Sequence, residues 1–269
     1  LEEFVRRFSA NASKSKQATS RKKLLDKINL DDIQPSSRKY PAIIFDQSRD
    51  AGNQILTVDN LSYEENGEVF FKNLSFTVNK DDKIAFLGRN SLAVTHLLNI
   101  LAEEKQPTSG TISYGQTITT SFLPNENATF FDYDLSLVDW LRQFSTNKDE
   151  VYVRGFLGKM LFSGEETLKS SSVLSGGEKV RCMLSRMMLK EANVLIINEP
   201  TNHLDLESIQ AFNNSLSDFK GIVMMTSHDH TFIQTVANRV IEIAPSGNLD
   251  KLMTYDEYIT NSKVSQQRA

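Results

Sequence analysis

The chain has 269 residues, of which 39% are hydrophobic and 24% are charged, with a formal net charge of −4. This composition is typical of a folded globular protein and excludes a disordered or fibrous chain, and the length allows one large domain with extensions. No apolar run approaches the roughly 20 residues of a membrane-spanning helix, and the N-terminus lacks the apolar core of a signal peptide. With Cys182 alone, no intrachain disulfide is possible, which fits a reducing cytoplasm.

The first 27 residues are expected to form a basic helix, because Phe4, Val5 and Phe8 fall at helical spacing. Residues 1–27 contain eight basic and three acidic residues, a net charge of +5, so the rest of the chain must carry −9. A basic arm on an acidic body often indicates contact with a polyanion, although many charged helices are simply solvated. Pro35 then breaks the helical pattern, and residues 1–54 are predicted to be a linker and connector.

From residue 55 onward, short β-type runs alternate with helical patterns, which predicts an α/β domain with a largely parallel sheet over residues 55–250. A C-terminal helix and tail are expected over 251–269, with a frayed Ser/Gln-rich end at 262–269. Strands are expected at 55–58, 74–78, 84–87, 194–197 and 222–225, and helices near 97–101, 137–141, 153–162 and 180–188.

The most specific motif is LSGGE at residues 174–178. Its simplest interpretation is a helix start, with Ser175 as the cap and Glu178 completing a capping box. Capping does not require Gly176 and Gly177, which allow close approach of the backbone and leave N–H groups at the positive end of a helix, where a phosphate binds well.

Two further motifs follow predicted buried strands. Glu199 follows the strand 194–197 after Asn198, at the strand end where α/β sheets bind ligands. His228 follows the strand 222–225. A lone histidine is more often structural than catalytic, but the three motifs in this order make coincidence a poor explanation.

Together these motifs resemble the ATP-binding cassette (ABC) family, and the segment 199–205 (EPTNHLD) resembles the ABC-F group in particular. That resemblance implies a P-loop NTPase-like cassette with a mixed, largely parallel central sheet, an antiparallel β part and a helical signature subdomain. ABC-F proteins carry two cassettes joined by long helices, have no membrane domain and act on the ribosome in translation or antibiotic protection. The chain therefore resembles the end of the linker followed by the second cassette, with helix 4–27 expected to contact tRNA and ribosomal RNA.

The resemblance also implies roles for single residues. Residues 175–178 match the signature motif, which touches the ATP held by the opposite cassette. Glu199 matches the carboxylate that polarises the attacking water, and His228 matches the histidine that contacts the γ-phosphate. Asp205 matches the D-loop at the interface between cassettes.

The phosphate loop departs from the pattern G-x-x-x-x-G-K-[ST] that should lie between strand 84–87 and the next helix. Its ends match, but alanine replaces the second glycine and valine replaces the lysine. Losing a charged hydrogen bond costs about 1.5–3 kcal/mol, or about 10- to 150-fold in affinity. Backbone groups can still face a phosphate, so the candidate ATP-binding residues of this loop are Gly88, Asn90, Ser91, Ala93, Val94 and Thr95.

The expected magnesium and adenine contacts are also weak. Asn198 replaces an aspartate of the family pattern, and an amide adds no negative charge to hold Mg²⁺. Asn125 is the nearest equivalent of the missing Q-loop glutamine, which leaves Thr95, Asn198 and Asn125 as a weak Mg²⁺ site. Tyr63 is the only nearby candidate for stacking on adenine, although a surface tyrosine is more often simple packing.

These losses all affect the nucleotide that this cassette itself would hold, whereas the signature motif is intact. We therefore predict a cassette that binds ATP and Mg²⁺ weakly and donates its signature to a second cassette, within a longer polypeptide or in a homodimer. Two alternatives remain at this point: the ATPase subunit of a membrane transporter, which should have an intact Q-loop, and a non-hydrolysing interaction or regulatory cassette.

Overall fold

The computed structural model describes residues 40–244 and 247–268. The predicted basic helix 4–27 lies outside these residues. In the described part of the chain, no helix is long and apolar enough to cross a membrane.

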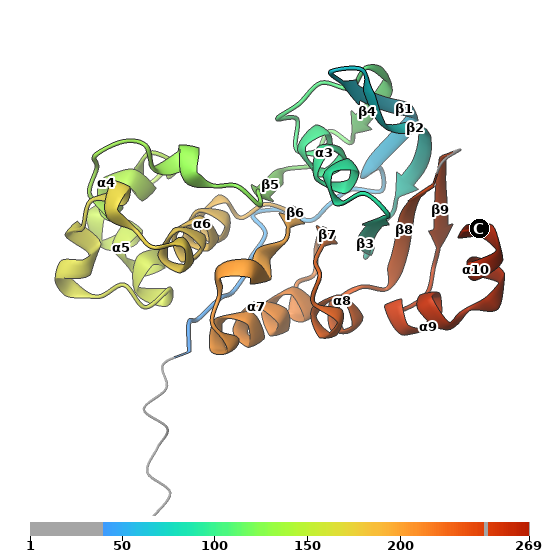
Figure 1. Cartoon of the computed structure of the whole chain (residues 1–269). Coiled ribbons are helices and arrows are strands. Elements are labelled where there is room, and N and C mark those ends of the chain that lie inside the picture. The colour runs from blue at the N-terminus through green and yellow to red at the C-terminus, as the bar shows by residue number, and fades with distance from the viewer. Residues whose placement is uncertain (1–39, 245–246, 269) are drawn as a thin grey trace, which may run out of the picture. The chain divides into compact units, whose positions relative to one another are not determined.

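The centre of the fold is a six-stranded sheet in the order β5-β6-β7-β3-β8-β9 (Figure 1). All neighbours are parallel except β8 and β9, so the predicted mixed, largely parallel sheet is confirmed. Alternate side chains of each strand face opposite layers, as the pleat requires: Ala85 packs on one face of the sheet, and Ile84 and Phe86 pack on the other. The strands are β3 (Lys83–Gly88), β5 (Thr120–Leu123), β6 (Val194–Asn198), β7 (Ile222–Thr226), β8 (Arg239–Ala244) and β9 (Gly247–Lys251).

A second, antiparallel sheet in the order β2-β1-β4 covers helix α3 (Ser91–Leu101) (Figure 1). Asn66 and Gly67 form the hairpin turn between β1 and β2, both with positive φ (53° and 82°), as a tight two-residue turn requires. Leu97 and Leu98 of α3 are fully buried between the two sheets. The strands are β1 (Leu56–Glu65), β2 (Glu68–Val78) and β4 (Ser109–Tyr114).

A group of helices lies beyond the β5 edge of the central sheet (Figure 1). Its core is Trp140, whose ring stacks on Phe131 at 4.6 Å between centroids and whose Nε1 donates to the Phe130 carbonyl. This group is the helical subdomain that the sequence predicted. It consists of η2 (Ala128–Phe131), α4 (Leu137–Arg142), α5 (Glu150–Lys159), η3 (Gly164–Leu168), η4 (Ser171–Val173) and α6 (Gly176–Lys190).

The face of the central sheet opposite α3 is covered by α7 (Leu206–Asp218) and α8 (His230–Val236) (Figure 1). Phe212 of α7 and Phe232 of α8 have ring centroids 5.6 Å apart. Phe45 of the connector packs edge-on against Phe212 at 5.9 Å, which ties the connector to this layer.

The C-terminal segment corrects one expectation. Residues 262–268 form helix α10 (Ser262–Arg268) after α9 (Tyr255–Thr260) and are not a frayed tail. The reason is a single apolar anchor: Val264 is 1% exposed and packs with Val240 and Tyr258.

Candidate nucleotide site

The carboxyl ends of β3, β6 and β7 meet at one edge of the sheet, because these strands are parallel neighbours. A pocket of about 370 Å³ opens there and is lined by Thr95, Asn125, Glu199 and His228, among others. Three predicted residues of the phosphate loop, Gly88, Ser91 and Val94, line it as well, so the structure brings together seven of the predicted site residues at the place where open α/β sheets bind ligands.

Glu199 and His228 form the centre of this pocket. Glu199 has a left-handed backbone (φ 48°), which turns the chain sharply at the end of β6. Its Oε2 accepts the His228 backbone N–H at 3.0 Å, and its Oε1 lies 3.6 Å from His228 Nε2. Burial raises the pKa of the Glu199 carboxyl, while the neighbouring His228 partly opposes that rise. A carboxyl group with a raised pKa, held beside a histidine, is suited to accept a proton from water.

Asn198 and Thr95 lie together beneath Glu199. The Asn198 amide Nδ2 donates to Thr95 Oγ1 at 3.3 Å, and its Oδ1 is buried without a hydrogen-bond partner. That orphaned oxygen and the Thr95 hydroxyl are both magnesium-type donors, but both are neutral. The described residues contain no group of three or more His, Cys, Asp or Glu side chains able to hold a metal. The donor set therefore fits Mg²⁺ poorly.

The phosphate loop is shorter than its sequence pattern suggests. In the P-loop motif the helix follows the whole pattern, whereas here α3 already begins at Ser91. Asn90 caps this helix: its side chain accepts the Leu92 N–H at 2.9 Å and its carbonyl accepts the Ala93 N–H at 3.2 Å. Two N–H groups that would face a phosphate are thus already bonded. Val94, at the lysine position, is 3% exposed and packs in the core.

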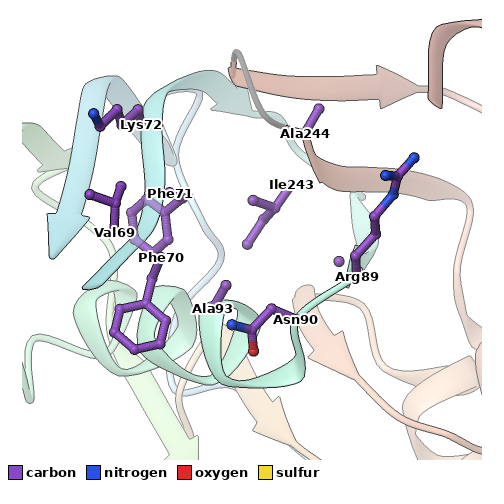
Figure 2. Close-up of a pocket in the computed structure, with 10 residues that line it drawn as sticks. Val69, Phe70, Phe71, Lys72, Arg89, Asn90, Ala93, Ile243 and Ala244 are labelled. Atoms are coloured by element: carbon purple, nitrogen blue, oxygen red, sulfur yellow. The ribbon is translucent and has the colours of Figure 1, made fainter. Parts of the chain in front are cut away.

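A second pocket, of about 350 Å³, lies between the start of β2, the loop and the end of β8 (Figure 2). Figure 2 shows Phe70 beside α3, with Asn90 and Ala93 below the pocket and Ile243 across it. Phe70 lines this pocket, and its ring packs edge-on against His96 at 4.4 Å between centroids. Phe70 was not among the predicted site residues, because it lies inside an otherwise ordinary strand.

Tyr63, the predicted adenine-stacking residue, lines neither of these two pockets. Its ring is 7% exposed and lies 4.9 Å from the His96 ring, between centroids, with Lys105 Nζ 5.0 Å away. Its hydroxyl donates to Glu65 Oε1 at 3.0 Å. Phe70 and Phe71 of β2 also lie beside the ring, and Tyr63 lines a smaller pocket of about 190 Å³, separate from the pocket around Thr95.

The signature segment has the predicted helix-start geometry at α6. Ser175 Oγ accepts the Glu178 N–H at 3.3 Å, and Glu178 Oε2 accepts the Ser175 N–H at 2.9 Å. That backbone N–H, together with the Ser175 hydroxyl and Lys169, lowers the pKa of Glu178. The capping box is therefore complete and ionised at neutral pH.

The two glycines of this segment face the turn η5 (Pro200–His203). A Cβ on Gly177 would lie 2.7 Å from the His203 carbonyl oxygen, so only glycine allows this approach. The next helix, α7, is capped by Asp205, whose side chain accepts the Ser208 N–H at 2.7 Å. Signature and D-loop segments are therefore adjacent, and none of residues 175–178 lines the pocket around Thr95.

Comparison with known proteins agrees with this geometry. Two family models, both described as ABC transporter, match residues 71–202 and 1–45. The chain is 58% identical to the uncharacterized ABC transporter ATP-binding protein YkpA of Bacillus subtilis, covering 99% of this chain and 50% of that protein. It is 30% identical to Protein GCN20 of Saccharomyces cerevisiae and 27% identical to ABC transporter F family member 2 of Arabidopsis thaliana, covering 97% and 99% of this chain but only 35% and 40% of those proteins. The chain thus spans half the length of these relatives or less.

Solved structures share the fold. An ATP-binding subunit of an ABC transporter matches with a TM-score of 0.64 at 18% identity, covering 78% of this chain and 94% of that one. A dimeric ATP-binding cassette in a post-hydrolysis state, bound to ADP and Pi, matches with a TM-score of 0.61 at 14% identity, covering 74% of this chain and 99% of that one.

Proposed function

Because the chain contains an ATP-binding cassette of the ABC transporter family, we propose that it is the signature-donating partner in an asymmetric ABC-F-type ATPase. It presents an intact signature to the ATP of a second cassette and holds its own ATP and Mg²⁺ weakly. The observation that carries this proposal is the state of the phosphate loop, where Val94 is buried in the core and Asn90 already occupies the N–H groups at the start of α3.

The intact signature segment supports the same division of roles between the two cassettes. The capping box of Ser175 and Glu178 keeps the start of α6 rigid, and Gly176 is exposed at that start. In an ABC pair each ATP lies between one phosphate loop and the other cassette's signature, so this surface serves a partner. The partner that this asymmetry requires is a further cassette with an intact phosphate loop, in a longer polypeptide, because a homodimer of this chain would pair two loops that both carry Val94.

For its own site, Glu199 is the residue that orients a water molecule and accepts its proton, with His228 beside the terminal phosphate. Burial of the carboxylate strengthens this basic role by raising its pKa. The general-base pair is therefore retained, and weak nucleotide binding limits turnover. This distinguishes the proposal from a simple interaction module, in which no residue would need this geometry.

Calorimetry of Mg-ATP binding tests the degenerate site. We expect the native chain to bind poorly and a Val94→Lys, Asn198→Asp double variant to bind at least ten-fold more tightly, because a charged contact is restored. Val151→Lys, at a position 79% exposed, is the matched control for added charge. Low-micromolar binding by the native chain would contradict the proposal.

Signature donation is tested by mixing two chains. The double variant with Ser175→Arg has a restored loop but a broken signature, so it should hydrolyse ATP slowly alone. Adding the native chain should raise turnover, because its signature completes the restored site. Adding the single variant Ser175→Arg, which has the native phosphate loop but a broken signature, should not raise turnover. Equal rates in both mixtures would refute donation.

We further propose that the basic segment 4–27 contacts ribosomal RNA or tRNA in the cytoplasm. Support comes from the net charge of +5 that residues 1–27 carry beside a body of −9, and from the ABC-F relatives. Replacing Arg21, Lys22, Lys23 and Lys27 by glutamine should weaken ribosome binding and flatten its dependence on salt, since each phosphate contact contributes to that slope. An unchanged slope would contradict the proposal.

A further inference from the structure

Helix α9, which precedes α10 near the end of the chain, contributes a side chain to the candidate nucleotide pocket. Tyr255, the first residue of α9, lines the same pocket as Thr95, Glu199 and His228. It lies more than 50 residues beyond the cassette match at 71–202, so no motif of the sequence analysis pointed to it.

The start of α9, including Tyr255, is held in place by contacts with α8. Its ring packs edge-on against His230 at 5.2 Å between centroids, and His230 Nε2 lies 2.8 Å from Asp256 Oδ1. The Asp256 backbone N–H donates to Gln234 Oε1 at 2.8 Å. These contacts fasten α9 to α8, the helix that begins two residues after His228 (Figure 1).

The other anchor is the next turn of α9. Tyr258 is fully buried, and its hydroxyl donates to Glu242 Oε2 at 2.6 Å. Glu242 lies on β8 and itself lines the pocket. Because α9 is fixed to both α8 and β8, the Tyr255 ring has a defined position at the pocket wall.

The Tyr255 hydroxyl remains available as a donor. Within residues 40–244 and 247–268 it makes no hydrogen bond, unlike the hydroxyls of Tyr258 and Tyr114. Because the loop has no lysine, neutral hydrogen-bond donors must contact the phosphates in this pocket. A hydroxyl donates a strong hydrogen bond to a charged phosphate oxygen. The pocket is shared with Glu199 and His228, the residues assigned to the terminal phosphate.

We propose that Tyr255 is a nucleotide-binding residue whose hydroxyl donates to the terminal phosphate of ATP. This inference rests on the proposed function, since it assigns a further residue to the same site. It makes α9 one wall of the nucleotide pocket and predicts that Tyr255 favours ATP over ADP.

The test uses the Val94→Lys, Asn198→Asp chain, with and without Tyr255→Phe, and calorimetry with Mg-ATP and Mg-ADP. Tyr255→Phe keeps the ring contact with His230, so we expect an unchanged Tm, ATP affinity weakened about five- to ten-fold, and ADP affinity changed less than two-fold. Tyr152→Phe, in the helical subdomain, is the matched control and should change neither affinity.

Equal ATP affinity with and without the Tyr255 hydroxyl would overturn the inference and leave the proposed function standing. Equal losses for ATP and ADP would also overturn it, because the contact would then not be to the terminal phosphate. The Tm of the restored chain first shows that it is folded; if the folded restored chain binds no nucleotide, the proposed function fails, and the inference fails with it.

Discussion

Asn198 donates a hydrogen bond to Thr95 across 3.3 Å, joining the end of β6 directly to the second turn of α3. Both side chains occupy positions that face Mg²⁺ in the family pattern. Here an amide, which is neutral and 1% exposed, contacts the hydroxyl, and its own oxygen is left without a partner. The contact links β6 to α3 and leaves a buried acceptor without a partner.

Asn198→Asp should make stability depend on the ion. The new carboxylate is buried, so in the absence of Mg²⁺ at pH 7 we expect a loss of about 1–3 kcal/mol. Burial raises the carboxyl pKa, so this loss should shrink as the pH falls toward 4. Millimolar Mg²⁺ should restore part of the Tm. Asn214→Asp, exposed on α7, is the control, and an unchanged Tm in metal-free buffer would contradict this expectation.

The signature glycines should differ sharply in their tolerance of alanine. A Cβ at Gly177 would lie 2.7 Å from the His203 carbonyl, and relieving this clash should cost about 1–3 kcal/mol. At Gly176 the nearest atom is His203 Nδ1 at 3.3 Å, a side-chain atom that can move. Gly176→Ala should therefore be neutral or slightly stabilising, since alanine favours helices. Urea unfolding measures the free energy of unfolding of both variants. Equal values would contradict this expectation and show that the η5 turn can move away from a Cβ at Gly177.

The central strands were predictable because burial on both faces makes them continuous apolar runs. Residues 194–197 and 222–225 were expected as strands, and β6 and β7 each extend only one residue further. Helix α10 was not predictable, because this Ser/Gln-rich segment has a single apolar anchor, Val264, and one such residue gives no helical periodicity.

The sequence predicted that Glu199 and His228 lie at neighbouring strand ends, but it did not predict the conformation of the phosphate loop. Glu199 and His228 follow buried strands, and strand order brings them together. The early start of α3 depends on Asn90 as its N-cap. Asparagine is a common N-cap residue, but Asn90 was assigned to the phosphate loop instead. The packing around Tyr63 could not be predicted, because it involves His96 and Lys105, which lie far from Tyr63 in the sequence.

Removing the apolar anchor of α10 should loosen the C-terminal segment locally. Val264→Ala removes two buried methyl groups, and we expect a cost of about 1–2 kcal/mol. Hydrogen exchange should rise in residues 255–267 and stay unchanged in β6 and β7. Gln266→Ala, exposed on the same helix, is the control. Uniform faster exchange over the whole chain would instead show that α10 unfolds only together with the rest of the chain.

Glu199→Gln should stabilise the chain at neutral pH. The folded state holds the carboxyl proton more tightly than the unfolded state, because burial raises the pKa of Glu199 above 4.5. Stability from this group is therefore greatest below pH 4.5 and is lost as the pH rises through the raised pKa. Glutamine carries no such charge and still accepts the His228 N–H, so the variant should match the native chain near pH 4 and exceed it at pH 7.

Urea unfolding at pH 4, 5, 6 and 7 checks this expectation, with the exposed Glu126→Gln as the control. In the restored-loop background the same Glu199→Gln change should abolish turnover while ATP binding persists, because the carboxylate acts on water and does not hold the nucleotide. A stability difference that does not vary with pH would show that desolvation of the Glu199 charge is unimportant. Full turnover without the carboxylate would remove Glu199 from the role of general base.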